Sequence, residues 1–293
     1  MDASRVNVDV PGSSANLGPG YDCLAVALPL RLRVEVERRP GPLAVTVAGE
    51  GADALPADAS NLVAATLLAE LDERGDDLAI AIDNAIPLGA GCGSSAAAIV
   101  AALAAADALR DRPRDDASLI LRATAIEGHP DNVAASVLGG ITIAAGDPPV
   151  ARRIEPPAGL ALVVAVADER VATRDARAAL ADAVPRGDAV WNLQHVALLV
   201  HALHTGSLDD LATALTDRLH QDARAPLMPS FAALHARADE LGALGVTLSG
   251  AGPSVLVWCA QDDADRVADA VRGILPSSAV HPVRPEATGL VVA

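Results

Sequence analysis

The stretch of residues 86–98, IPLGAGCGSSAAA, decides how the fold of this chain is interpreted. It contains three alternating glycines, then two serines, and then an alanine-rich run. Residues 78–82 before it, LAIAI, are a short apolar run that predicts a strand, and residues 94–109 after it have helical length and many small side chains. We therefore expect a glycine-rich loop that joins a strand to the start of a helix.

This loop has the features of a phosphate cradle. The first backbone N–H groups of a helix have no partner within the helix, and together with the positive end of the helix dipole they attract phosphate. Glycines let the backbone approach a phosphate closely, and serine hydroxyls can contact phosphate or magnesium. The alternative is a plain turn in which Ser94 or Ser95 caps the helix. The spacing is neither that of a Walker A loop nor the G-x-G-x-x-G of a dinucleotide fold.

The composition is that of an acidic globular protein. The chain has 293 residues, of which 51% are hydrophobic and 1% aromatic, with a net charge of −16 and a pI of about 4.7. This charge argues against nucleic acid or an anionic membrane as a partner. All 22 basic residues are arginine. The absence of lysine excludes a P-loop NTPase, a protein kinase and Schiff-base chemistry, because each of these needs a lysine.

The cysteines and the first residues predict a cytoplasmic protein. The three cysteines are too few and too scattered for a disulfide framework or a zinc site, so a reducing compartment is expected. The opening MDASRVNVDVPG has no basic start and no long apolar run, so we expect no signal peptide. No stretch of about 18 apolar residues predicts a membrane span.

Strands and helices interleave along the whole chain, which predicts an α/β or α+β protein. The segment 146–157, GDPPVARRIEPP, carries four prolines and a charge cluster and is the best candidate boundary. It divides the chain into domains 1–150 and 151–293. Alternation predicts strands at 6–10, 30–37 and 43–47, and an apolar run predicts one at 160–166. Further strands are predicted at 141–145, 246–249, 255–258, 280–283 and 290–292. Helical spacing predicts helices at 61–73, 118–126, 131–138, 174–183, 189–204, 208–219, 230–241 and 263–272.

Three further motifs accompany the glycine loop. Residues 10–22, VPGSSANLGPGYD, place Asn16 and Asp22 around a second glycine-rich turn. Residues 127–132, EGHPDN, pack four polar groups between two predicted helices, and residues 248–254, LSGAGPS, form a glycine turn between two strands. Each motif alone has a plain alternative, namely an Asx turn, a capped helix start and a hairpin.

The four motifs, in this order, resemble those of the GHMP small-molecule kinases over almost the whole chain. Within that superfamily, NLGPGYD and EGHPDNV resemble the homoserine kinases. The resemblance implies an α+β fold of two domains, the first like domain 2 of ribosomal protein S5 and the second ferredoxin-like. It also implies that ATP and homoserine bind in the cleft between the domains. The implied reaction is ATP-dependent phosphorylation of L-homoserine to O-phospho-L-homoserine, a step of threonine biosynthesis.

The resemblance further implies which residues bind ATP and magnesium. Ser95 would ligate Mg²⁺ with Glu127 as its carboxylate partner, and both would act in catalysis. Asn61 matches a position on the adenine side, with a helix cap as its alternative role. The phosphates would be bound by Pro87, Leu88, Gly89, Ala90, Gly91, Cys92, Gly93, Ser94 and Ser95.

The implied substrate carries an ammonium, a carboxylate and a hydroxyl, so its site needs opposite charges held apart. Asn16 and Asp22 suit the amino-alcohol end, and an arginine fork suits the carboxylate because it binds both oxygens. Arg177 and Arg224 match the family by context, although each has the alternative of a surface arginine. Before Arg224 the family often has Glu-Pro-Tyr, which is Gln-Asp-Ala here. The substrate site is therefore expected to contain Asn16, Asp22, His129, Asn132, Arg177, Arg224 and Gly250.

Some alternatives stay open at this level. Asp131 would be either a general base or, as we favour, a group that orients its neighbours in a reaction without a strong base. Cys92 stands where the family usually has leucine and is expected to pack rather than react. The runner-up functions are another GHMP kinase, acting on mevalonate, a sugar or an isoprenoid precursor, and a non-catalytic ligand-binding member of the fold. A homodimer is one expectation for the assembly.

Overall fold

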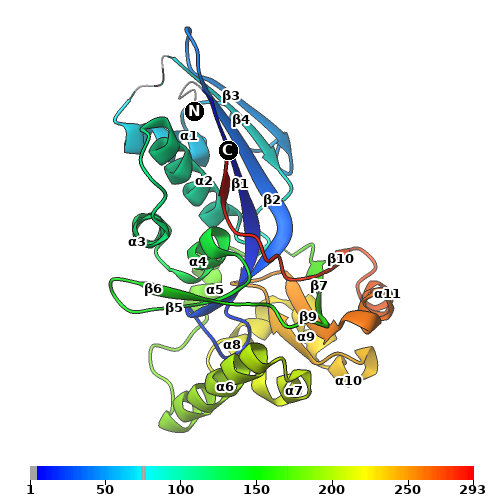
Figure 1. Ribbon diagram of the computed structural model, residues 1–293. Helices are drawn as coiled ribbons and strands as arrows, with labels where there is room; N and C mark the ends of the chain where they lie inside the picture. The colour runs from blue at the N-terminus through cyan, green and yellow to red at the C-terminus, as the bar shows by residue number, and fades with distance from the viewer. Residues whose placement is uncertain (1–4, 74, 76, 170) are drawn as a thin grey trace.

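The first part of the molecule is built on a seven-stranded sheet with the order β11-β1-β2-β4-β3, and β5 pairs with β2 and β6. The computed structural model describes residues 5–73, 75, 77–169 and 171–293 (Figure 1). The strands are β1 (Arg5–Ala15), β2 (Leu24–Arg38), β3 (Ala44–Gly49), β4 (Leu78–Asn84), β5 (Ile141–Ala145), β6 (Val150–Ile154) and β11 (Val291–Val292).

Helices cover one face of this sheet (Figure 1). In β2, Leu32, Val34 and Val36 point toward the helices and are buried, while Arg33 between them is exposed on the other face. The small residues of α2 let it pack closely against β1 and against the other helices. The helices are α1 (Leu62–Leu71), α2 (Ser94–Leu109), α3 (Asp116–Glu127) and α4 (Asp131–Leu138).

The second part is a four-stranded antiparallel sheet of order β10-β7-β9-β8 with helices between its strands. One helical connection precedes the β8–β9 hairpin and one follows it, which is the ferredoxin-like arrangement. The strands are β7 (Leu160–Val166), β8 (Gly245–Leu248), β9 (Val255–Ala260) and β10 (Ala279–Val283). The α-helices are α5 (Thr173–Ala178), α6 (Arg186–Thr205), α7 (Leu211–Ala214), α8 (Gln221–Arg224), α9 (Pro229–His235), α10 (Ala238–Leu241) and α11 (Ala264–Ile274). The short 3₁₀ helices are η1 (Leu208–Asp210), η2 (Ala225–Leu227) and η3 (Gln261–Asp263).

Several elements differ from their predicted bounds. Strand β1 does not end at Pro11–Gly12 but continues to Ala15, with a shift of register at that step. Proline has no N–H for the ladder, so pairing is interrupted there and then resumes. The predicted helix 208–219 stops at Ala214, because Asp217 accepts the N–H groups of the following residues and starts α8 instead. The predicted helix 230–241 is divided into α9 and α10.

Two features bear on the predicted domain boundary. The proline-rich segment 146–157 contains β6, which pairs with β5 in the first sheet. The last strand, β11, returns to pair with β1, so the two ends of the described chain lie close together (Figure 1). The division at residue 150 stays a prediction.

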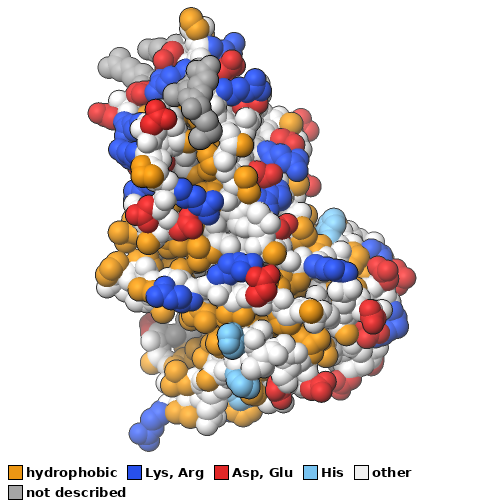
Figure 2. Space-filling view, in the orientation of Figure 1, with side chains coloured by type: hydrophobic (Ala, Val, Ile, Leu, Met, Phe, Trp, Pro, Cys, Tyr) orange, Lys and Arg blue, Asp and Glu red, His pale blue; other side chains and the backbone are white. Residues whose placement is uncertain are grey.

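The surface in the same orientation mixes charges of both signs rather than separating them, and hydrophobic side chains gather across its middle, at the level of β5 and β6 (Figure 2). None of the helices in the described ranges is long and apolar enough to cross a membrane.

Candidate active site

The glycine loop between β4 and α2 is held tightly against its neighbours. Gly89, Gly91 and Gly93 have φ angles of +63°, +76° and +70°, which favour glycine. A Cβ on Gly93 would lie 2.2 Å from the Ser13 Oγ, and one on Gly91 would lie 2.2 Å from the Ser249 carbonyl oxygen. A Cβ on Gly89 would meet nothing within 4 Å. The second half of the loop, at Gly91 and Gly93, is therefore packed against β1 and the β8–β9 hairpin. Around Gly89 the loop has free space beside it.

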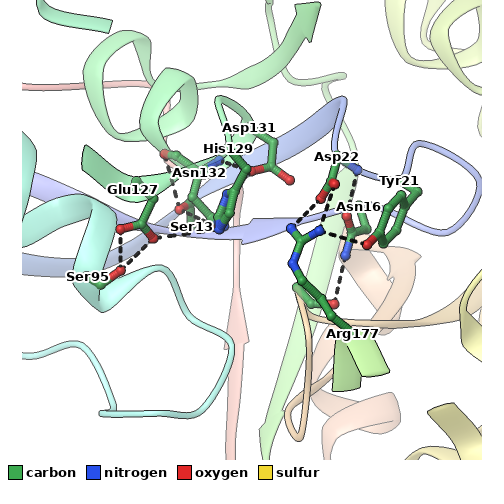
Figure 3. Close-up of polar contacts among 11 residues, drawn as sticks. Ser13, Asn16, Tyr21, Asp22, Ser95, Glu127, His129, Asp131, Asn132 and Arg177 are labelled. Atoms are coloured by element: carbon green, nitrogen blue, oxygen red, sulfur yellow. Dashed lines mark hydrogen bonds and ion pairs between the residues drawn. The ribbon is translucent and has the colours of Figure 1, made fainter. Parts of the chain in front are cut away.

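Ser95 and Glu127 meet beside this loop (Figure 3). Ser95 is the second residue of α2, Glu127 is the last residue of α3, and the Ser95 hydroxyl is 2.6 Å from Glu127 Oε2. A hydroxyl and a carboxylate are the hard oxygen ligands that Mg²⁺ takes when phosphates and waters supply the rest. This donor pair fits magnesium. No cluster of three or more His, Cys, Asp or Glu that could hold a metal is found in the described part of the chain.

His129, Asp131 and Asn132 lie around the start of α4. The His129 Nδ1 donates to Asp131 Oδ1 at 2.7 Å, and the same oxygen accepts the Asn132 backbone N–H at 2.8 Å. The bond to Asp131 raises the pKa of His129 above its ordinary value, against the effect of burial. The Asn132 amide oxygen accepts from the Ser13 hydroxyl at 2.8 Å. One oxygen of the Asp131 carboxylate, Oδ1, therefore holds both the His129 ring and the backbone at the start of α4.

Asp22 and Arg177 form a bidentate ion pair across the cleft (Figure 3). Arg177 Nη2 donates to Asp22 Oδ1 at 2.9 Å and Nη1 donates to Oδ2 at 3.0 Å, with the Tyr21 hydroxyl also 3.0 Å from Nη1. Hydrogen bonding to Asp22 raises the pKa of Arg177, so the guanidinium stays charged. Asn16, at φ +71°, accepts the Asp22 backbone N–H and donates to the Gly250 carbonyl oxygen at 2.8 Å. The turn of residues 16–22 is thereby fixed to the β8–β9 hairpin.

Arg224 is a buried cation. Its side chain is among the largest that are fully buried, with 1% of its surface exposed. The Nε donates to the Ala176 carbonyl oxygen at 3.0 Å, and Nη1 donates to His220 Nδ1 at 3.2 Å and to the Gly250 carbonyl oxygen at 3.3 Å. Among the described residues, no carboxylate lies within ion-pair distance of this guanidinium. Burial accordingly lowers the pKa of Arg224.

These groups line one cavity of about 160 Å³. It brings together all the predicted site residues except Asn61 and Leu88. Asn61 instead caps α1, accepting the Val63 N–H at 3.0 Å and donating to the Pro56 carbonyl oxygen, which is the alternative role considered above. The predicted residues that line the cavity are Asn16, Asp22, Pro87, Gly89, Ala90, Gly91, Cys92, Gly93, Ser94, Ser95, Glu127, His129, Asp131, Asn132, Arg177, Arg224 and Gly250.

The structure adds residues that the sequence did not single out. Thr173 and Ala251 also line the cavity, Ser13 binds Asn132, and Tyr21 binds Arg177. Ser13 and Tyr21 stand within the VPGSSANLGPGYD motif, so their place in a motif was the available signal. Thr173 begins the Thr…Ala-Arg…Leu run by which Arg177 matches the family, so its place in that run was the available signal.

Cys92 packs and is not poised to react. It is buried, its Sγ lies 3.9 Å from the Ser254 Oγ, and burial raises the pKa of its thiol to about 11. Because the thiolate is the reactive form, this agrees with the expectation that Cys92 fills space within the loop.

Comparison with known proteins agrees with this geometry. The family model described as GHMP kinases N terminal domain matches residues 61–140, and the model described as GHMP kinases C terminal matches residues 199–276. A homoserine kinase of Moorella thermoacetica is 41% identical over 257 residues, which cover 86% of each chain. A homoserine kinase of Gloeobacter violaceus is 43% identical over 281 residues, which cover 94% of each chain.

The fold is also similar to that of a homoserine kinase whose structure has been solved. The crystal structure of homoserine kinase from Cytophaga hutchinsonii superposes with a TM-score of 0.88 at 26% identity, covering 100% of this chain and 98% of the other. The two-domain α+β fold that the motifs implied is therefore confirmed. The chain is a GHMP kinase and belongs, within that superfamily, to the homoserine kinase family.

Proposed function

We propose that this protein transfers the γ-phosphoryl group of ATP to the side-chain hydroxyl of L-homoserine, giving O-phospho-L-homoserine for threonine biosynthesis. The use of ATP follows from membership of the GHMP kinases. The acceptor is supported by the homoserine kinase relatives and by the charges of the cavity.

The observation that carries the proposal is the buried guanidinium of Arg224. A buried cation is costly unless an anion compensates it, and no carboxylate of the described chain does so. Arg224 lines the same cavity as Asp22 and Arg177. An amino acid bound there would place its carboxylate against the arginines and its ammonium against Asp22, with Asn16 between them. Mevalonate or a sugar has no ammonium to match Asp22.

The phosphoryl donor would lie at the other end of the cavity. The loop of residues 87–95 would bind the phosphates through its backbone and the start of α2. Ser95 and Glu127 would hold a magnesium ion, which would neutralise charge on the phosphates. Asn61 would contribute to the adenine side only through the position of α1, since both ends of its amide are already bonded.

Transfer needs positioning and charge stabilisation more than a strong base. We propose that Asp131 orients His129 and the start of α4, because its Oδ1 accepts from both the His129 ring and the Asn132 backbone N–H. The hydroxyl of the acceptor would point toward the loop, where backbone N–H groups and the dipole of α2 stabilise the charge that develops. The acceptor hydroxyl would lose its proton to an oxygen of the transferred phosphoryl group or to water as the O–P bond forms and the bond to ADP breaks, rather than to a side-chain base.

The remaining expectations rest on this function. A biosynthetic kinase with three free cysteines suits the cytoplasm, and a small molecule is its partner. A homodimer stays a prediction.

The test is a coupled ADP-release assay with magnesium-ATP and four acceptors: L-homoserine, L-threonine, mevalonate and galactose. We expect turnover with L-homoserine far above that with the other three. Turnover with mevalonate or galactose but not with L-homoserine would leave a GHMP kinase and reject the substrate. ADP release with none of them would favour a non-catalytic member of the fold.

A further inference from the structure

We infer that His220 is a positioning residue for Arg224, and that its ring fixes the direction in which the buried guanidinium meets the carboxylate of the substrate. This inference rests on the proposed function, since it assigns a role within the same site. His220 itself does not line the cavity. Its residue type and its position between Leu219 and Gln221 gave no sign of such a role.

The hydrogen-bond partners of His220 define which ring nitrogen carries the hydrogen. Nε2 lies 2.8 Å from the Gly18 carbonyl oxygen, which can only accept, so Nε2 must donate. In a neutral ring Nδ1 is then an acceptor, and it lies 3.2 Å from Nη1 of Arg224, which can only donate. Burial lowers the pKa of His220, which keeps the ring neutral and preserves this arrangement.

The ring joins three parts of the chain that meet at the cavity. Gly18 belongs to the turn that carries Asp22, and the Tyr21 ring of the same turn lies 5.2 Å from the His220 ring, centroid to centroid. Arg224 is bonded in turn to Ala176, the residue before Arg177. The acceptor at Nδ1 of His220 therefore holds Arg224 at the point where these three segments meet.

The segment that bears His220 is itself held rigidly. Asp217 accepts the backbone N–H groups of His220 and Gln221, each at 2.8 Å, and Gln221 accepts the Leu248 N–H of β8 at 2.8 Å. These bonds fix the backbone at His220, and the bond from Nε2 to the Gly18 carbonyl oxygen fixes the ring. A rigid acceptor at Nδ1 orients the guanidinium before the carboxylate arrives, so less ordering is needed on binding.

Two substitutions separate this role from a structural one. The side chain of His220→Asn places its amide oxygen where Nδ1 stands, so it keeps an acceptor for Arg224 and loses the bond to Gly18. The side chain of His220→Gln places its amide nitrogen where Nε2 stands, so it keeps the bond to Gly18 and loses the acceptor. We expect His220→Gln to raise the KM for L-homoserine by about tenfold or more, with kcat and the KM for ATP within about twofold. His220→Asn should stay within about threefold of the unaltered enzyme in all three constants.

A double-mutant cycle with Arg224→Met completes the test. If His220 acts through Arg224, His220→Gln should change the KM for L-homoserine by less than about twofold in the Arg224→Met background. An equal rise in both backgrounds, an equal rise in both His220 variants, or a loss of kcat without a change in KM would overturn the inference. Failure of the unaltered enzyme to turn over L-homoserine would reject the proposed function, and this inference with it.

A spectroscopic readout covers the case in which His220→Gln or Arg224→Met does not fold, because it needs only the unaltered protein and His220→Asn. In the unaltered protein labelled with ¹⁵N-histidine, the signal missing from the His220→Asn spectrum belongs to His220. Chemical shifts of a neutral ring with hydrogen on Nε2 are expected. Hydrogen on Nδ1, or on both nitrogens at neutral pH, would overturn the inference.

Discussion

The ion pair between Asp22 and Arg177 suggests how single residues select the substrate. Both groups are paired with each other across the cleft, and each is proposed to meet one charge of the amino acid. A zwitterion can exchange both partners at once, whereas a ligand with one charge leaves the other residue without its counter-charge. We therefore expect an acceptor that lacks either charge to have a much lower kcat/KM than L-homoserine.

This leads to a prediction with two homoserine analogues. We expect 4-hydroxybutanoate, which lacks the ammonium, and 3-aminopropan-1-ol, which lacks the carboxylate, to lose roughly a thousandfold or more in kcat/KM, because the site's polar groups would be left unpaired. Asp22→Asn should reduce kcat/KM for L-homoserine much more than for 4-hydroxybutanoate. Steady-state kinetics with both acceptors measures this, and equal losses for the two would exclude Asp22 as the ammonium partner.

His129 gives a prediction about stability and pH. Its bond to Asp131 raises its folded-state pKa above the unfolded value of about 6.5. The stabilisation by protonated His129 is therefore fully present below about pH 6 and is lost as pH rises through the raised pKa. In urea unfolding, His129→Gln should be destabilised relative to the unaltered protein more at pH 5.5 than at pH 8.5.

The control for this measurement is His201→Gln. His201 is exposed on α6, and no carboxylate partner of its side chain is found in the described part of the chain. Its substitution should have a similar effect at both pH values. A His129→Gln effect that is equally independent of pH would show that the bond to Asp131 does not depend on protonation of the ring.

At the scale of elements, the glycine loop can be tested by two matched substitutions. Gly89 and Gly91 share a positive φ, so alanine at either costs about 1–2 kcal/mol from the backbone alone. Gly91→Ala would in addition place Cβ 2.2 Å from the Ser249 carbonyl oxygen, whereas Gly89→Ala would meet nothing within 4 Å. We expect Gly91→Ala to lower the free energy of unfolding by about 2 kcal/mol more than Gly89→Ala. Equal losses would mean that the loop and the hairpin do not touch as described.

Elements bounded by strong local signals could be predicted from the sequence closely. The helices 94–109 and 131–138 have their expected bounds, because Gly93 and Gly139 stop the helical pattern at one end of each. The bounds of elements that depend on partners distant in the sequence could not be predicted in this way. The continuation of β1 past Pro11 depends on pairing with β2, and the end of α7 depends on the bonds of Asp217.

In the candidate site, too, local motifs could be recognised in the sequence, whereas contacts between distant segments could not. Residues inside a motif, such as Ser95 and Glu127, could be predicted because the motif and the chemistry coincide. The bonds of Ser13, Tyr21 and His220 join segments more than a hundred residues apart, and no local pattern encodes such a contact. The resemblance to a family predicted the position of Arg224, but it did not predict what holds the side chain in place.

At the scale of the whole molecule, the end of the chain closes the first sheet. Leu290 is buried, its N–H donates to the Val137 carbonyl oxygen, and its own carbonyl oxygen accepts from Arg114. Deletion of residues 290–293 should lower the free energy of unfolding by about 2–4 kcal/mol, from the lost burial and hydrogen bonds. Urea unfolding measures this.

The control is the double substitution Val291→Thr and Val292→Thr. Both side chains are exposed, at 42% and 37%, so the strand is kept and little stability should be lost. A deletion that is no more destabilising than this control would mean that β11 is not part of the folded sheet.

The measurement that tests the central claim most directly is ³¹P NMR of the reaction product. Incubation with magnesium-ATP and L-homoserine should yield a phosphomonoester signal split by the two protons of the adjacent CH₂ group, together with ADP. Glu127→Gln, which removes the carboxylate beside Ser95, should abolish most of this signal while the protein stays folded. ADP with inorganic phosphate alone, or a phosphomonoester formed equally well by Glu127→Gln, would contradict the account of a homoserine kinase that acts through this cleft.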